Sequence, residues 1–118
     1  MGLLFLFRRL ALEAVKLVFE NIEAAYQDGK NRAAREHMLY AAYKAGGAFS
    51  KSYVGYIHAV AHSLGGQYGT PHGLANAVIM PYVLEAYGET VYQKLHKLGI
   101  AANLCTAEQT DKDPRKFL

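Results

Sequence analysis

Apolar residues recur at helical spacing over most of this chain, and this periodicity is the feature that most limits how it folds. Between residues 10 and 25 the apolar positions share one face, while charged residues occupy the other. Such a pattern is typical of an amphipathic α-helix. The sequence contains no sustained apolar–polar alternation bounded by hairpin turns. We therefore predict an all-α fold, a helical bundle.

Turn and capping residues divide the chain into five predicted helices. The first is expected from about Arg9, or somewhat earlier, to Tyr26, where the turn residues Asp28-Gly29 end it. Asn31 is suited to cap the second helix, in which Gly46-Gly47 indicates either tight packing or the helix end. The third helix is predicted at residues 55–64 and is closed by Gly65-Gly66. The fourth is predicted at residues 71–86, with Thr70 as its cap, Pro71 in its first position and a kink at Pro81. The fifth is predicted at residues 89–98, with Gly99 at its end.

Length and composition restrict the class of protein. The 118 residues suit one domain, residues 1–118, because single domains cluster near ~100–150 residues. A hydrophobic fraction of 52% argues against disorder, and a net charge of +3 without a basic stripe argues against nucleic-acid binding. Cys105 is the only cysteine, so no internal disulfide is expected. No apolar run approaches the ~20 residues of a membrane span. We expect a soluble, cytoplasmic protein with neither membrane nor nucleic-acid partners.

Residues 52–84 contain no Asp, Glu, Lys or Arg, and this charge-free segment holds three of the five histidines. Charge depletion suggests burial. His58 and His62 are four residues apart and so share one helix face, while His72 lies in the first turn of the next predicted helix. Imidazoles in this arrangement could bind one metal ion or flank one ligand, and the free amides of a helix start also suit an anion.

A plainer interpretation of these histidines stays open. A histidine in an apolar segment is often a core residue bonded to a backbone carbonyl, and motif matches have real false-positive rates. His37 and His96 lie on charge-rich helices and are expected to be solvated. Five tyrosines are expected in the core and at interfaces rather than as a stacking platform: Tyr53, Tyr56, Tyr68, Tyr82 and Tyr87.

Several other kinds of site are excluded by missing motifs. The sequence has no His-Glu-x-x-His, no Cys-x-x-Cys and no Gly-x-Gly-x-x-Gly, and no Lys-Ser/Thr follows Gly65-Gly66. A zinc-protease site, a zinc ribbon, a dinucleotide loop and a phosphate-binding P-loop are therefore not expected within these residues. Cys105 lies near a predicted helix end and has no assigned role.

The histidine-containing segments resemble a known family. GYIHAVAHSLGG at 55–66, PHG at 71–73, ANA at 75–77 and PYVL at 81–84 look like the second signature of iron-containing (group III) alcohol dehydrogenases. Upstream, LALEAV at 10–15, NIE at 21–23 and AGGAF at 45–49 are also similar to that family. The resemblance covers about residues 9–105, and residues 1–8 do not match.

The resemblance implies the all-helical C-terminal domain of an enzyme that interconverts alcohols with aldehydes or ketones, using NAD(P) and a divalent metal. That metal is iron(II), or sometimes zinc, held in the family by one Asp and three His. His58 and His72 correspond to two of these ligands. His62 corresponds to a non-ligand histidine on the substrate and nicotinamide side, and is the candidate catalytic proton relay. A Lewis-acidic metal and a neutral imidazole suit alcohol oxidation.

The chain also departs from the family pattern. No part of it matches the nucleotide-binding domain, the ligating Asp or the first ligating His. Two imidazoles hold a metal weakly, because stable sites keep three or more protein ligands. We therefore expect an incomplete metal site, no NAD site, and no alcohol oxidation by these residues alone. Two alternatives remain: a self-associating helical module, in which a homo-oligomer could complete a metal site between chains, and a folded chain without function.

Overall fold

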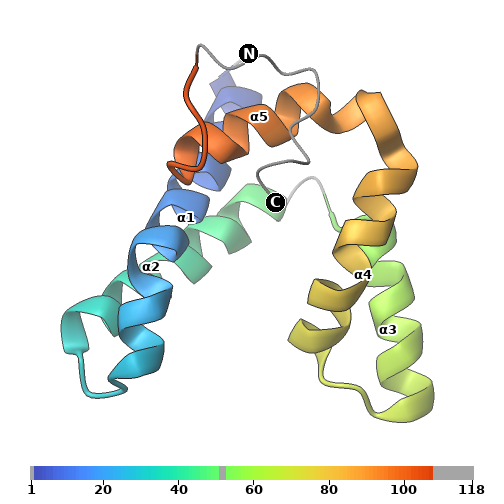
Figure 1. Ribbon diagram of the computed structural model, residues 1–118, viewed down its shortest axis with the longest axis horizontal. Coiled ribbons are helices and arrows are strands. Elements are labelled where there is room, and N and C mark those ends of the chain that lie inside the picture. Colours follow the sequence, from blue (N-terminus) through green and yellow to red (C-terminus); the bar gives the residue numbers. More distant parts are fainter. Residues whose placement is uncertain (1, 51–52, 108–118) are drawn as a thin grey trace. The chain divides into compact units, whose positions relative to one another are not determined.

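The computed structural model describes residues 2–50 and 53–107, and within them the protein is helical with no strand. The elements follow in the order α1 (Gly2–Gln27), α2 (Arg32–Phe49), α3 (Tyr56–Tyr68), α4 (His72–Tyr87), the short 3-10 helix η1 (Gly88–Val91) and α5 (Tyr92–Ala101), as Figure 1 shows. The predicted all-α fold is confirmed. The chain forms two compact units: the first contains α1, α2 and α5, and the second, Tyr53–Val91, contains α3, α4 and η1.

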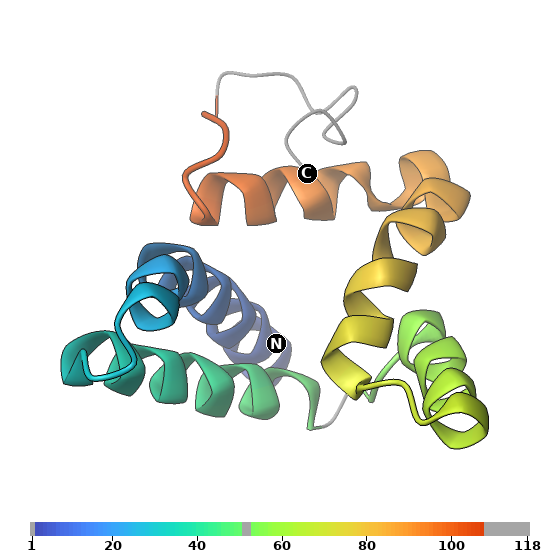
Figure 2. The same cartoon turned by 60° about the horizontal axis from the view of Figure 1, so that its bottom comes forward.

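In the first unit α1 and α2 lie side by side, joined by a tight turn (Figure 2). The turn begins at Asp28, whose carbonyl accepts from the Asn31 N–H at 3.0 Å. The Asn31 side chain accepts from the Ala34 N–H at 3.1 Å, which satisfies one free amide of the first turn of α2. The predicted stop and the predicted cap are both confirmed.

Small side chains let these two helices approach each other. Ala14 of α1 and Ala34 and Ala41 of α2 are buried. A Cβ atom at Gly47 would lie 3.3 Å from Cδ1 of Leu10 on α1. Gly46-Gly47 lies inside α2 rather than at its end, so close packing is the correct interpretation of Gly47.

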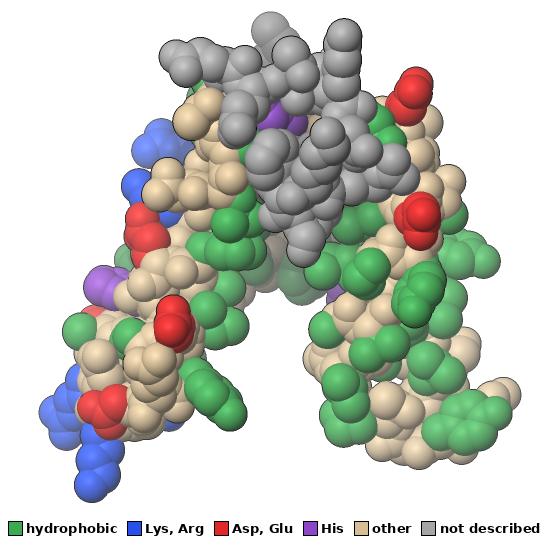
Figure 3. Space-filling view, in the orientation of Figure 1, with side chains coloured by type: hydrophobic (Ala, Val, Ile, Leu, Met, Phe, Trp, Pro, Cys, Tyr) green, Lys and Arg blue, Asp and Glu red, His purple; other side chains and the backbone are tan. Residues whose placement is uncertain are grey.

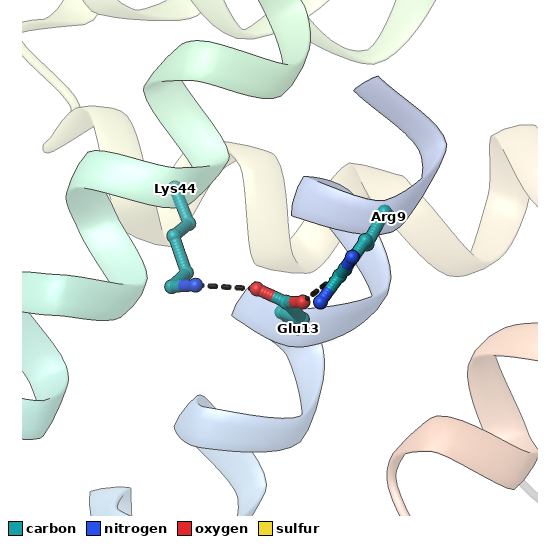
Figure 4. Close-up of polar contacts among 3 residues, drawn as sticks. All are labelled: Arg9, Glu13 and Lys44. Carbon is teal, nitrogen blue, oxygen red and sulfur yellow. Dashed lines mark hydrogen bonds and ion pairs between the residues drawn. The ribbon is translucent and has the colours of Figure 1, made fainter. Parts of the chain in front are cut away.

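An ion-pair cluster also joins the two helices (Figure 4). Glu13 of α1 pairs with Lys44 of α2, and Arg9 Nε donates to the other Glu13 carboxylate oxygen at 2.8 Å. The hydrogen bond from Lys44 and then that from Arg9 lower the pKa of Glu13. The cluster keeps this carboxylate charged where α1 and α2 meet.

In the second unit α3 ends later than the sequence predicts. The helix continues through Gly65-Gly66 to Tyr68. It ends at Gly69, which has a φ of 66° and donates its N–H to the Gly65 carbonyl. The predicted end at residue 64 is wrong, because glycine weakens a helix but terminates it only where a left-handed conformation is adopted.

The next two helix starts also differ slightly from prediction. Pro71 is the N-cap of α4, which begins at His72, so the cap lies one residue later than expected. Pro81 lies inside α4, which continues to Tyr87; the kink at this proline stays a prediction. The segment from Glu89 first forms η1, and α5 begins only at Tyr92.

The last described residues fold back onto α5. Gly99 lies inside this helix and is buried, and a Cβ atom there would lie 2.8 Å from Sγ of Cys105. Cys105 is itself buried, and its thiol donates to the His96 carbonyl at 3.7 Å. Gly99 therefore makes room for Cys105 instead of ending the helix, and the cysteine has a packing role that the sequence did not indicate. The sequence also predicts a polar tail from Thr106, of which residues 108–118 lie outside the described residues.

Candidate metal centre

The three histidines of the charge-free segment lie together in the second unit. His58 and His62 are one turn apart on α3, with ring centroids 6.1 Å from each other. The turn at Gly69 leads into α4, which His72 begins. The His72 ring centroid lies 5.3 Å from that of His58 and 5.3 Å from that of His62. The spatial grouping that the sequence suggested is present.

The ring orientations differ between the two pairs that include His72. The His72 ring is stacked on His62, with 29° between the planes, and tilted by 51° against His58. Two imidazoles that bind one tetrahedral ion, with nitrogen–metal distances of about 2.0–2.1 Å, hold their ring centroids about 5 Å apart. The 5.3 Å separations of His72 from His58 and from His62 therefore both suit two ligands of one ion.

The donor set is nevertheless small. Over residues 2–50 and 53–107 no group of three or more His, Cys, Asp and Glu side chains could hold a metal ion. Neutral imidazoles suit iron(II) and zinc. A pair of them falls short of the three or more protein ligands of a stable site, so the described residues fit a divalent metal as part of its ligand set.

These histidines are not core residues. His58 is half-buried, and His62 and His72 are exposed. The plainer interpretation, a buried histidine bonded to a backbone carbonyl, therefore does not describe His62 or His72. The exposed rings of His62 and His72 therefore lie at the surface of the unit.

The burial expected for the charge-free segment is wrong for this chain. In the second unit the buried side chains are Ala61, Ala75 and Val83. Figure 3 shows hydrophobic side chains over the outer surface of this unit. The exposed large apolar residues there include all five tyrosines expected in the core and at interfaces, none of which lies in the core: Tyr53, Val54, Tyr56, Tyr68, Leu74, Val78, Met80, Tyr82 and Tyr87. Charge depletion marks an apolar surface here, not a core.

Asn76 is a polar neighbour of this centre that the sequence indicated only as part of a family motif. It lies one turn after His72 on α4, and its side-chain Nδ2 is 3.1 Å from Nε2 of His72. The same Nδ2 donates to the His72 backbone carbonyl at 3.0 Å. Its Oδ1 is buried and has no hydrogen-bond partner among the described residues. The four-residue spacing from His72 was the available signal.

The other two histidines belong to the first unit. His37 is exposed, as predicted, and its Nδ1 lies 2.9 Å from Oδ1 of Asn21. His96 is half-buried, so the prediction that it is solvated is only partly correct, and its Nε2 lies 3.3 Å from the Thr106 carbonyl.

An open apolar groove on the first unit contains no predicted site residue. It is lined by Ile22, Ala25, Tyr26, Arg35, Met38 and Leu39. None of the described helices is long and apolar enough to cross a membrane.

Comparison with known proteins connects this helical histidine centre to one class of enzyme. Residues 6–116 match the model of the Fe-containing alcohol dehydrogenase family, C-terminal. The chain is 53% identical over 108 residues to alcohol dehydrogenase 4 of Saccharomyces cerevisiae, covering 92% of this chain and 28% of that protein. It is 49% identical over 73 residues to 1,3-propanediol dehydrogenase of Klebsiella pneumoniae, covering 62% of this chain and 19% of that protein.

A solved structure is similar as well. The crystal structure of a 1,3-propanediol oxidoreductase superposes with a TM-score of 0.85 at 35% identity, covering 92% of this chain and 28% of that one. The chain belongs to the Fe-containing alcohol dehydrogenase family and corresponds to its C-terminal part. The family match extends beyond the resemblance at residues 9–105 in both directions. The chain spans 28% of the length of its yeast relative.

Proposed function

We propose that this chain supplies part of the metal centre of an NAD(P)-dependent alcohol dehydrogenase, with His58 and His72 as two ligands of iron(II) or zinc. The observation that carries the proposal is the histidine cluster itself, in which the His72 ring centroid on one helix lies 5.3 Å from those of both His58 and His62 on another; the family resemblance favours His58 over His62 as the second ligand. Family membership supports the same assignment. The substrates are small alcohols or aldehydes, the class to which the names of the relatives point.

The roles of the three imidazoles follow from their chemistry. A divalent ion held by His58 and His72 supplies a Lewis acid that polarises the alcohol oxygen. His62, stacked on His72 with 5.3 Å between the ring centroids, is exposed and free to take up the hydroxyl proton and pass it to water. A bound nicotinamide would supply the hydride acceptor, and the sequence of these residues contains no dinucleotide-binding motif.

The isolated 118 residues are proposed to be inactive. They offer two metal-binding imidazoles and no glycine-rich dinucleotide loop. We expect the purified chain to show no NAD-dependent alcohol oxidation and no NAD binding by calorimetry. Oxidation that survives removal of all contaminating enzyme would contradict this proposal.

Metal content tests the ligand assignment. The purified chain is loaded anaerobically with Fe(II) and, separately, with Zn(II), and the bound metal is measured after gel filtration. Weak retention that is lost in both His58→Ala and His72→Ala supports the proposal. His37→Ala is the matched control, because it removes an exposed helical histidine of the first unit. Equal metal content in wild type and all three variants would refute the assignment.

A self-associating helical module is the second candidate function. It is supported by the exposed apolar residues of the second unit and by Leu3, Leu4, Phe5 and Leu6 at the start of α1. We expect a homo-oligomer in sedimentation velocity. A monomer over the whole accessible concentration range would rule out this candidate and leave the metal assignment to be decided on its own.

A cytoplasmic location and a single domain over residues 1–118 stay predictions. Fractionation of cells that express the protein with a tag tests the first. Cooperative unfolding in a single transition tests the second, because one domain of this size unfolds in one step.

A further inference from the structure

The first two turns of α1 have no counterpart on α2. The contacts between these two antiparallel helices keep a nearly constant register, as three pairs show: Asn21 with His37, Glu13 with Lys44, and Leu10 with Gly47. The same register places Phe49, the last residue of α2, beside Arg8. Residues 2–7 of α1 therefore extend beyond the helix against which α1 packs.

The side chains of these two turns are apolar and exposed. Leu3, Leu4 and Phe5 are 62%, 60% and 69% exposed, and Leu6 is 47% exposed. Four consecutive residues of an α-helix are spaced by about 100° around its axis, so these side chains cover its whole circumference. A second protein helix covers one stripe of such a surface, whereas lipid surrounds it on all sides. The distribution favours lipid over a partner helix.

Basic side chains follow directly after the apolar turns. Arg8 is exposed and has no ion pair among residues 2–50 and 53–107. Arg9 and Lys44 share the single carboxylate of Glu13. Residues 2–12 contain no Asp or Glu, so this end of α1 keeps an excess of positive charge. An anionic surface is its electrostatic complement.

We propose that the apolar tip, residues 2–7 of α1, inserts into the headgroup region of an anionic membrane surface, with Arg8 and Arg9 at the lipid phosphates. At about 1.5 Å per residue the tip is roughly 9 Å long, and interfacial helices bury their apolar side chains about 5–10 Å deep. The tip therefore suits the interface and is too short for a span. The expectation of no membrane partner came from the missing span and does not address a surface contact.

The membrane contact is independent of the proposed metal centre. The histidine cluster belongs to the second unit, whereas α1 belongs to the first. The family match begins at residue 6, so Leu3, Leu4 and Phe5 precede it. The contact therefore adds an interaction surface that the family match does not include.

Vesicle flotation with the 118-residue chain tests the contact. The vesicles contain phosphatidylcholine alone, or phosphatidylcholine with about one-third phosphatidylserine, at low ionic strength. We expect the chain to float with the anionic vesicles, to bind the neutral ones at least about fivefold more weakly, and to be released by salt. No flotation with the anionic vesicles, or equal binding to both compositions, would overturn the proposal.

Two pairs of variants locate the contact. Leu4→Asp combined with Phe5→Asp should weaken binding to the anionic vesicles by at least about tenfold, because two buried apolar side chains are lost. Leu39→Asp, at an exposed position of α2, should leave binding unchanged. Arg8→Gln should weaken binding by about fivefold, and Arg32→Gln, at the other end of the α1–α2 pair, should have a smaller effect. Equal losses in a variant and its control would contradict a contact through the apolar tip.

A tryptophan at position 5 provides a readout that does not depend on a loss of binding. The sequence contains no Trp, so Phe5→Trp carries the only indole, and Leu39→Trp is its matched control on α2. With anionic vesicles we expect a blue-shifted emission and quenching by brominated acyl chains for Phe5→Trp and neither for Leu39→Trp. An unchanged Phe5→Trp spectrum would refute insertion of the tip, even if the Asp variants do not fold.

A second copy of the chain is the competing occupant of the apolar tip, as in the self-associating candidate. Sedimentation velocity without lipid detects it. An oligomer that Leu4→Asp combined with Phe5→Asp abolishes, in a chain that does not float with anionic vesicles, would assign the tip to a second copy and overturn the membrane contact. Failure of metal loading would leave vesicle binding unchanged, so the two proposals fail separately.

Discussion

The two units of this protein use their polar residues in opposite ways. Every described Lys and Arg belongs to the first unit, where Lys44 and Arg9 hold Glu13 at the contact of α1 and α2. The second unit has no Lys or Arg, and it contains the cluster of three histidines with Asn76 beside His72. Polar chemistry stabilises helix packing in one unit and remains available for a ligand in the other.

The two units also differ in how their helices are capped at the N-terminus. Asn31 caps α2 with a side-chain hydrogen bond, whereas α3 and α4 begin at Gly55 and Pro71 without one. The second unit is also small, and chains below ~40 residues rarely hold a fold without a metal, a disulfide or a partner. A metal bound only by the folded state would add stability there through mass action. The comparison indicates that the helices of the first unit are stabilised by caps and packing, whereas those of the second unit leave polar side chains available for a ligand.

The largest stability effect is expected from overpacking the first unit. Ala41 is fully buried, so Ala41→Leu should lower the free energy of unfolding by about 1–3 kcal/mol. Ala42→Leu is the matched control, because Ala42 is exposed on the same helix and the introduced leucine would be in solvent there. Urea unfolding followed by circular dichroism measures both. Equal effects would show that α1 and α2 are not closely packed at Ala41.

The next effect concerns the turn that places His72 beside α3. Gly69 has a φ of 66°, a left-handed conformation that costs another residue roughly 1–2 kcal/mol. Gly69→Ala should therefore destabilise the second unit by about that amount and weaken the NMR contacts between the His58 and His72 rings.

Gly66→Ala is the control for this turn. Gly66 is helical and a Cβ atom there meets nothing within 4 Å, so the substitution should stabilise α3 by about 0.5–1 kcal/mol. The two substitutions are expected to change the free energy of unfolding in opposite directions, Gly69→Ala lowering it and Gly66→Ala raising it. Two losses of similar size would mean that Gly69 does not adopt the left-handed conformation in solution.

A smaller effect is expected where the helix caps differ. Asn31→Ala removes the side-chain acceptor for the Ala34 N–H and should cost about 1 kcal/mol of unfolding free energy. Gly55→Ser, which gives α3 the side-chain acceptor that it lacks, should gain only a few tenths of a kcal/mol. Thermal unfolding of the two variants beside wild type measures the contrast. A larger loss from Gly55→Ser than from Asn31→Ala would reverse our comparison of the units.

Sequence reasoning was most successful where local chemistry alone decides the structure. The cap at Asn31, the stop at Asp28 and the shared face of His58 and His62 depend on neighbours within four residues, and all are present. The end of α3 was wrong because three glycines could each have ended it, and only Gly69 takes the left-handed conformation. The pairing of Gly99 with Cys105 was missed because it depends on how the chain folds back onto α5.

In the candidate site, too, the features set by nearby residues were predictable and those set by tertiary packing were not. The histidine cluster was predictable because a short turn joins its two helices. The exposure of the charge-free segment was not predictable, because an apolar sequence does not show whether its side chains are covered by other groups or exposed to solvent. The Asn76 contact was visible only as a four-residue spacing, and its donor polarity depends on the backbone carbonyl that it also binds.

The smallest effect is a pH dependence confined to the first unit. The bonds from Lys44 and then Arg9 lower the folded-state pKa of Glu13, so the charged carboxylate stabilises the fold at neutral pH. This contribution is present above the unfolded pKa of Glu13 and is lost as the pH falls through its lowered folded pKa. Wild type should therefore exceed Glu13→Gln in stability at neutral pH, by less than the Asn31 cap contributes, and the difference should shrink in acid.

Salt and a second carboxylate distinguish this pair from a general charge effect. Because the side chains of Glu13 and Lys44 retain 35% and 21% of their exposure, added salt should reduce the difference at neutral pH. Glu20→Gln is the control, since the Glu20 carboxylate lies 3.9 Å from Lys16 with both side chains more than half exposed. Urea midpoints of the two variants and wild type at acid and neutral pH provide the measurement. If Glu20→Gln changes stability as much as Glu13→Gln does, net charge and not the α1–α2 ion pair sets the pH dependence of the first unit.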